Sequence, residues 1–154
     1  MTLDAILRGQ APRTALRRGT AILREGQACD RFPWLTRGRA RVLRTGLSGR
    51  QGKICSVTAG EICAIAAVCA LKDLPSPVEV VVEEDGDVCL VPAAVFRRLF
   101  LTNETVRVAV LDALARRLVS LVELLDNIVL HPTDSRLAAY LVDRASAFRG
   151  GRPP

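Results

Sequence analysis

The side chains in this sequence that could carry out chemistry are few, and their spacing excludes most catalytic sites. The single histidine, His131, precedes a proline and has no serine or cysteine beside it that would complete a catalytic triad. A single histidine also cannot supply the ligands of most zinc sites. We therefore expect His131 to cap the end of a helix. No serine lies in the Gly-x-Ser-x-Gly arrangement that exposes a nucleophile. The sequence therefore predicts neither enzymatic activity nor a metal site.

Five cysteines are the second group of chemical candidates. Cys63 and Cys69 are six residues apart, Cys29 precedes them, and Cys55 and Cys89 lie in predicted strands. Thiolates bind iron–sulfur clusters and form switchable disulfides, so Cys29, Cys63 and Cys69 are candidates for a redox or cluster sensor. However, the sequence has no Cys-x2-Cys run, and an offset of six on a helix separates two side chains in azimuth. Burial as a small apolar residue is the other interpretation.

One stretch, Thr58–Val82, has the residue types of a small ligand-binding turn and helix, and we call it the cassette segment. Gly60 can adopt positive φ, and the uncharged apolar run Ala64–Leu71 predicts a short helix. Pro75 and Pro77 then favour an extended path into a β-branched strand. Free N–H groups at the start of such a helix can hold an anion. The alternative is an apolar helix that plugs one end of a β-barrel.

Before and after the cassette segment, short β-prone runs alternate with turn residues. Residues 48–52, which contain two glycines, predict a hairpin tip. Val78–Glu83 and Val88–Val91 flank the acidic sequence Glu84–Asp87, whose Asp-Gly pair predicts a second hairpin turn. Many short strands at regular spacing are typical of a sandwich or jelly roll.

The pattern becomes helical after Pro92, with one helix predicted at Ala93–Leu101 and a longer one at Glu104–Leu130. A helix of that second length is roughly 40 Å long, more than a small barrel needs as a cover. Its apolar seam recurs at steps of three and four: Val110, Leu114, Leu118, Leu121, Leu125 and Ile128. We therefore predict a parallel homodimer through Glu104–Leu130. The alternative is that the helix packs lengthwise on its own barrel.

Composition and charge bound the class of protein. At 154 residues and 49% hydrophobic content, the chain can bury one good core, and no apolar run reaches the length of a membrane span. An odd number of cysteines agrees with a reducing compartment, so we expect a cytoplasmic protein with no membrane partner. Residues 1–53 carry 12 basic and 3 acidic side chains, a net charge of +9. Because Arg37, Arg39 and Arg41 alternate with apolar residues, we interpret this charge as a solvated sheet face rather than a nucleic-acid surface.

The order of these motifs resembles a known family over most of the chain. Gly60-Glu61, the apolar helix and Pro75-Ser76-Pro77 resemble the phosphate-binding cassette of the cyclic-nucleotide-binding fold in Crp/Fnr-type regulators. Further segments fit the same pattern: Leu16–Gly19, Arg24–Gly26, Phe32–Val42, Arg97–Leu99 and Ala115–Leu118. The resemblance implies an α+β, mainly β fold, a double-stranded β-helix or jelly-roll barrel followed by a long dimerisation helix.

The same resemblance implies an effector pocket, and at one point of that pocket this chain differs from the family. The implied effector-binding residues are Gly60, Glu61, Ile62, Cys63, Pro75 and Ser76. Glu61 would hold a ribose hydroxyl, or alternatively cap the start of the following helix. Nucleotide-binding relatives have an arginine for the cyclic phosphate where this chain has Pro75–Val78, and losing that pair costs about 1.5–3 kcal/mol. We therefore leave the effector unidentified and do not expect a cyclic nucleotide.

These observations predict a β-roll sensing domain at 1–101, a dimerisation helix at 102–131 and a further helix with a flexible tail at 132–154. In the regulators that it resembles, a winged helix-turn-helix follows. The last residues of this sequence are too few for one, so we expect DNA binding only if a further C-terminal domain exists. The predicted function is that of an effector-sensing, dimerising domain of a Crp/Fnr-type regulator. A redox or iron–sulfur sensor and a protein-interaction module without ligand are the alternatives.

Overall fold

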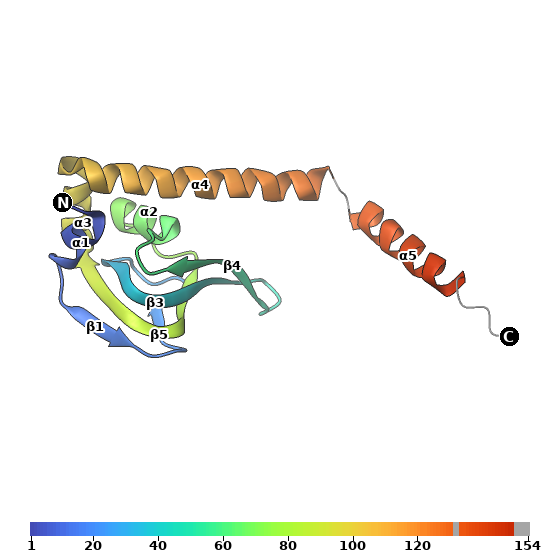
Figure 1. Cartoon of the computed structure of the whole chain (residues 1–154), viewed down its shortest axis with the longest axis horizontal. Coiled ribbons are helices and arrows are strands. Elements are labelled where there is room, and N and C mark those ends of the chain that lie inside the picture. The colour runs from blue at the N-terminus through green and yellow to red at the C-terminus, as the bar shows by residue number, and fades with distance from the viewer. Residues whose placement is uncertain (131–132, 150–154) are drawn as a thin grey trace. The chain divides into compact units, whose positions relative to one another are not determined.

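The protein is built on one antiparallel sheet whose two central strands are long and bent (Figure 1). The computed structural model describes residues 1–130 and 133–149. The strands run in the order β1-β5-β3-β4, and β2 also pairs with β5. Five helices complete the fold (Figure 1). The elements are α1 (Leu3–Arg8), β1 (Arg13–Leu16), β2 (Ala21–Leu23), β3 (Arg31–Thr45), β4 (Gln51–Thr58), α2 (Ala64–Lys72), β5 (Glu79–Pro92), α3 (Ala93–Thr102), α4 (Glu104–Val129) and α5 (Thr133–Arg149).

The central strand β5 does not contain the hairpin turn that its Asp-Gly sequence predicts. β5 continues unbroken through Glu84–Asp87, so the predicted hairpin turn at these residues does not exist. Its first half pairs with β2, as at Ala21 and Val81, and its second half pairs with β1, as at Leu16 and Gly86. The predicted hairpin between β3 and β4 is confirmed, with the chain turning between Thr45 and Gln51. The fold is thus the predicted antiparallel, jelly-roll-like β-roll followed by a long helix.

Two glycines explain why the Asp-Gly sequence forms no turn. Gly38 on β3 has a φ of +89° and lies against Gly86 on β5, where the strand register shifts. A Cβ at Gly38 would come within 2.8 Å of the Glu84 carbonyl oxygen, and a Cβ at Gly86 would overlap the Arg37 carbonyl. The two backbones therefore approach too closely for any side chain. The acidic residues beside Gly86 instead bond to neighbouring segments. Asp85 accepts a 2.6 Å hydrogen bond from the Arg18 N–H in the β1–β2 turn, and Asp87 pairs with Arg37 of β3 at 2.9 Å.

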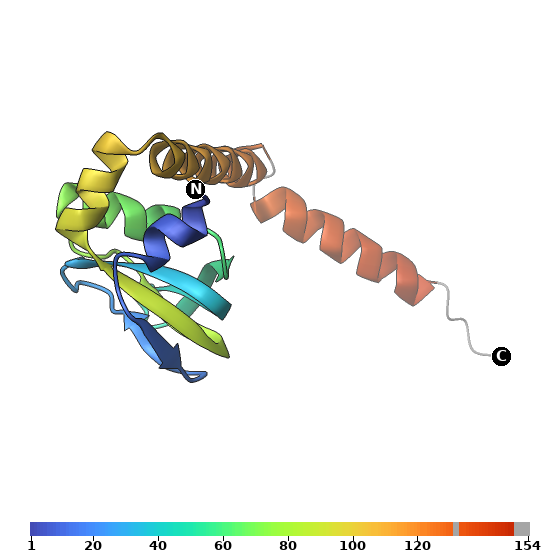
Figure 2. The same ribbon diagram turned by 60° about the vertical axis from the view of Figure 1, so that its left-hand side comes forward.

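The core lies between the sheet and the helices α1, α2 and α3, which gather on one side of it (Figure 1, Figure 2). Phe32 and Phe96 stack with ring centroids 4.0 Å apart, and this contact joins β3 to α3. The indole N–H of the buried Trp34 donates a 3.0 Å hydrogen bond to Asp4, which anchors α1 to the sheet. The predicted solvated face is also confirmed, because Arg37, Arg39 and Arg41 are exposed.

The long helix α4 starts within the β-roll unit. Asn103 accepts a hydrogen bond from the Val106 N–H and so caps the helix start. Val106 and Val110 are fully buried, and the compact unit extends to Leu114, beyond the predicted boundary at Leu101. Val110 therefore belongs to the chain's own core rather than to the predicted dimer seam, and Leu114 packs against that core too.

From Leu118 onward the apolar residues of α4 are exposed, with Leu118 at 63% and Leu125 at 57%. The further helix predicted within residues 132–154 is present as α5. His131, which we expected to cap a helix, and the tail predicted at 150–154 lie outside the described residues. Among the residues that the structure describes, none belongs to a helix long and apolar enough to span a bilayer.

Candidate functional site

The first half of the cassette segment is a tight turn that leads into α2. Gly60 has a φ of +84° and donates its N–H to the Leu35 carbonyl at 3.0 Å, which ties the turn to β3. Glu61 accepts a 2.9 Å hydrogen bond from the Thr58 N–H through Oε2. Its carboxylate closes the preceding turn, and the helix-capping alternative stays a prediction. The helix start is at Cys63, whose side chain makes no capping hydrogen bond, and α2 then follows the predicted apolar run through Lys72.

The second half of the cassette segment returns along a proline turn that is bonded to the loop after β2. Ser76 donates its N–H to the Gln27 carbonyl and accepts the Gly26 N–H at its own carbonyl, at 2.9 and 2.7 Å. Its hydroxyl donates to the Val78 carbonyl at 2.7 Å and accepts the Val78 N–H at 3.3 Å. Ser76 is only 2% exposed. The hydroxyl is thus hydrogen-bonded to the backbone as both donor and acceptor.

A guanidinium that sequence reasoning missed reaches this proline turn from another strand. Arg44, near the end of β3, donates a 3.2 Å hydrogen bond to the Pro77 carbonyl. Its position far from the turn in sequence gave no signal of this contact. Arg44 is exposed and therefore keeps further N–H donors in water.

The six predicted effector-binding residues share the turns around α2 but differ in accessibility. Gly60, Glu61 and Pro75 are exposed and Ile62 is half-buried, whereas Cys63 and Ser76 are buried. A nearby cavity of about 380 Å³ includes Pro75 from the predicted set. Its lining residues are Ile65, Val68, Cys69, Leu74, Pro75 and Pro77.

The residues of the cassette segment do not fit the phosphate of a cyclic mononucleotide. Pro75 stands where the family's arginine would be, and proline offers neither a charge nor an N–H. The Ser76 hydroxyl is already bonded to Val78. The turn before α2 supplies backbone N–H groups, but those of Gly60 and Glu61 are bonded to Leu35 and Thr58. Residues 75–78 therefore offer a cyclic phosphate no charged partner of their own, and the guanidinium that reaches this turn is that of Arg44 on β3.

The structure brings together two cysteines that are distant in sequence. The thiols of Cys29 and Cys69 lie close enough for each to affect the pKa of the other, and Cys69 donates to the Pro75 carbonyl at 3.9 Å. Burial and the neighbouring Cys69 raise the pKa of Cys29 to about 12. Burial likewise raises the pKa of Cys63 to about 11 and raises that of Cys69. These thiols stay protonated at neutral pH, and protonated thiols are poor metal ligands and slow to oxidise.

No group of three or more metal-binding side chains occurs within residues 1–130 and 133–149. A cluster site formed by Cys29, Cys63 and Cys69 therefore finds no support in this part of the chain. The Cys29–Cys69 contact instead joins the loop after β2 to α2, next to the bridge between Ala28 and Pro75. In the described structure this cysteine contact helps to hold the proline turn against the β-roll.

Comparison with solved structures shows the same fold in bacterial transcription regulators. The catabolite activator protein of Thermus thermophilus matches with a TM-score of 0.69 and 20% identity, over 82% of this chain and 58% of that one. A regulator of the Crp/Fnr family from Eubacterium rectale matches with a TM-score of 0.67 and 19% identity, over 94% of this chain and 67% of that one. The c-di-GMP-responsive global regulator of Xanthomonas campestris matches with a TM-score of 0.72 and 14% identity, over 92% and 70%.

The chain thus spans between 58% and 70% of the length of these three proteins. A search of curated protein sequences gives no match. The profile of the cyclic nucleotide-binding domain matches residues 13–103, more than half of the chain, and this range contains the whole sheet and the cassette segment. The chain therefore belongs to the cyclic nucleotide-binding domain family.

Proposed function

We propose that the chain is the effector-sensing, dimerising domain of a transcription regulator, with an effector other than a cyclic mononucleotide. The observation that carries this proposal is the division of α4. Its first turns, with Val106 and Val110, are part of the core of the β-roll unit, whereas its continuation is apolar and exposed. The exposed apolar residues of the continuation are Leu118, Val119, Leu121, Val122, Leu124, Leu125, Ile128 and Val129.

A second copy of the chain is the partner that best fits this exposed surface. Monomeric proteins rarely leave a contiguous apolar surface of this kind in water. Leu118, Leu121, Leu125 and Ile128 follow steps of three and four, which is the spacing of a helix packed along an equivalent helix. Two copies related by a two-fold axis would bury the same residues on both sides. The proposed dimer face is therefore these four residues, without Val110.

The β-roll unit also offers a physical route from the cassette segment to α4. Helix α2 packs on α3, and α3 follows directly after β5. Arg97 of α3 donates a 3.0 Å hydrogen bond to the Ala70 carbonyl near the end of α2. A shift of α2 would therefore move α3 and the start of α4. An effector that prefers one packing by a few kcal/mol would bias the two arrangements of the dimer helices.

The dimer is tested by placing a charge on the proposed face. Leu125→Glu buries a carboxylate in the interface, so we expect a dimeric wild type and a monomeric variant in sedimentation velocity at the same concentration. Asn127→Glu places the same charge two residues away, on an exposed polar position, and is the matched control. A wild-type chain that sediments as a monomer at high micromolar concentration would refute the dimer.

The effector site is tested by restoring the missing charge. Isothermal titration calorimetry with cyclic AMP and cyclic GMP should detect no micromolar binding by the wild type, since Pro75 replaces the arginine. Pro75→Arg should raise the affinity at least tenfold, because a charge-assisted pair with phosphate contributes about 1.5–3 kcal/mol. Thr14→Arg adds the same charge at an exposed residue of β1, which lines no part of this cavity, and controls for general attraction. Tight binding of either nucleotide by the wild type would contradict the proposal.

A further inference from the structure

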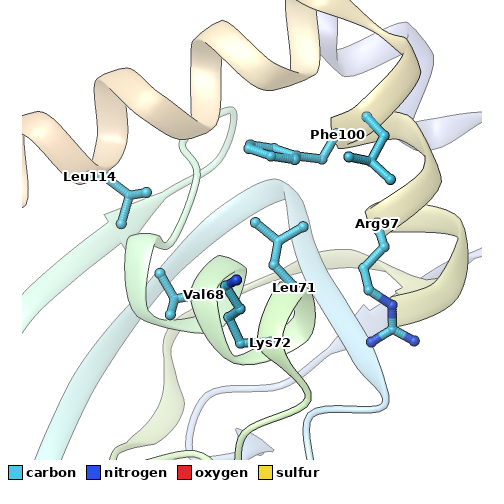
Figure 3. Close-up of a pocket in the computed structure, with 7 residues that line it drawn as sticks. Val68, Leu71, Lys72, Arg97, Phe100 and Leu114 are labelled. Atoms are coloured by element: carbon cyan, nitrogen blue, oxygen red, sulfur yellow. The ribbon is translucent and has the colours of Figure 1, made fainter.

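A second cavity lies beside the first within the β-roll unit, and Val68 of α2 lines both. It has a volume of about 430 Å³ and opens between α2, α3 and the start of α4. Figure 3 shows Val68, Leu71, Phe100 and Leu114 directed toward this common space, with Arg97 at its edge. Leu101 and Lys72 complete the lining. The volume is in the range of small-molecule sites, and the walls are preformed by three packed helices.

The chemistry of the lining is apolar with two cations and no acid. Five of the seven side chains are hydrocarbon, and the other two are Lys72 and Arg97. Lys72 forms no ion pair with any carboxylate among the residues that the structure describes. Arg97 uses Nη1 for the Ala70 carbonyl, which leaves other N–H donors of its guanidinium. The guanidinium is directed away from the cavity in Figure 3, so Lys72 is the cation at its margin, and it favours a ligand with one anionic end and a hydrocarbon body.

We propose that this cavity binds a carboxylic acid with an unbranched hydrocarbon chain, of the medium-chain fatty acid class. The chain packs against Val68, Leu71 and Phe100, and the carboxylate pairs with Lys72 at the margin of the cavity (Figure 3). Each methylene that leaves water for the apolar wall raises the affinity about fourfold. A neutral or cationic molecule of the same length lacks the electrostatic part of this interaction.

Binding in this cavity would place the ligand against α4 at Leu114, close to where the exposed part of the helix begins. A regulatory effect of such a ligand rests on the proposed function, because it requires that α4 be the dimerisation helix. The binding itself does not, since every lining residue lies within the compact unit Met1–Leu114. The two proposals can therefore fail separately.

The experiment is a titration of the full chain by isothermal titration calorimetry with hexanoate, octanoate and decanoate below their micelle concentrations. We expect saturable binding at one site per chain, with about fifteenfold higher affinity for each pair of added methylenes. Decylammonium, with the opposite charge on the same chain, should not saturate. Binding of decanoate and decylammonium with equal affinity, or no saturable binding of any acid, would overturn the proposal.

Variants separate the two parts of the site. Lys72→Gln removes a charge from an exposed side chain and should weaken decanoate at least tenfold. Lys53→Gln, an exposed lysine on β4 that pairs with Glu83, is the matched control and should leave the affinity unchanged. Val68→Trp fills the cavity and should abolish binding, and Lys72→Gln keeps the test decisive if the larger side chain prevents folding. Unchanged decanoate affinity in Lys72→Gln would refute the assignment.

A second copy of the chain is the competing occupant of the cavity. Comparing decanoate binding by the wild type and by the proposed monomer Leu125→Glu distinguishes the two. Equal affinities support a cavity that is open to the ligand in both states. Binding by Leu125→Glu alone would show that the partner chain covers the cavity in the wild type, and would overturn the proposal.

Discussion

The close crossing of β3 and β5 gives the sharpest stability prediction. Gly38→Ala has two costs that can be separated, because Gly38 combines a φ of +89° with neighbours that leave no room for a Cβ. A non-glycine residue at positive φ costs about 1–2 kcal/mol. A methyl group forced to within 2.8 Å of the Glu84 carbonyl and 2.9 Å of the Asp85 carbonyl adds about 1–3 kcal/mol, since both neighbours are backbone.

Gly49 in the β3–β4 turn provides the matched control. Its φ of +80° carries the same conformational cost, but no atom lies within 4 Å of an added Cβ. We therefore expect Gly49→Ala to lower the free energy of unfolding by about 1–2 kcal/mol and Gly38→Ala by about 2–5 kcal/mol. The difference between the two variants measures the close packing alone.

The assay is urea-induced unfolding followed by the fluorescence of Trp34, the single tryptophan of the chain, which is 1% exposed. All variants must be compared at one protein concentration, because association would stabilise the folded state by mass action. Equal destabilisation by the two substitutions would show that the β3–β5 crossing can relax and would refute the proposed role of Gly38. The m-value should stay unchanged in both variants if the substitutions act on the folded state.

Two further predictions concern buried polar groups. Asp4→Ala leaves the indole N–H of the buried Trp34 without its 3.0 Å acceptor and should lower the free energy of unfolding by about 1–3 kcal/mol. Asp4→Asn keeps an acceptor, so its free energy of unfolding should fall by less. Equal losses of stability in urea titrations of the two variants would contradict this. Burial raises the pKa of Cys29 in the folded chain from 9.0 to about 12. As the pH rises, the Cys29 thiol therefore loses its proton first in the unfolded chain, which stabilises the unfolded state. The stability contributed by the protonated thiol should be intact below pH 9 and fall as the pH rises toward 12. In reducing buffer Cys29→Ala should lessen this fall between pH 9 and 11, by up to about 1.4 kcal/mol per pH unit, and an unchanged pH slope would refute it.

The elements that sequence predicted well are those whose signals are local. Helix α2 follows the uncharged apolar run from Ala64, which ends at Lys72 where polar residues return. Asn103 caps α4 because its short amide accepts a backbone N–H, a preference that is visible from residue type alone. The order of the strands along the chain and the long helix also follow from patterns within a few residues.

The failures arise where distant residues decide the outcome. Asp85-Gly86 is a strong local turn signal, but the backbone of Gly38 occupies the space across from it and keeps β5 extended. The Cys29–Cys69 contact has no signature in cysteine spacing, because the β2 loop and α2 meet only in the folded roll. The sequence likewise did not indicate that the apolar seam of α4 changes from buried to exposed after Leu114. The same apolar spacing serves the chain's own core before it and open surface after it.

The central position of β5 has a consequence for synthesis on the ribosome. β5 supplies the pairing partner of β1, of β2 and of β3, so β1 and β2 lack a neighbour, and β3 pairs with β4 alone, until residues 79–92 have been translated. Apart from the β3–β4 hairpin, the nascent chain has no sheet to join and would keep Phe32 and Trp34 unpaired until then. Emergence of β5 from the exit tunnel should thus be the event that lets the roll close in one step, a moment at which nascent-chain protease resistance would rise abruptly.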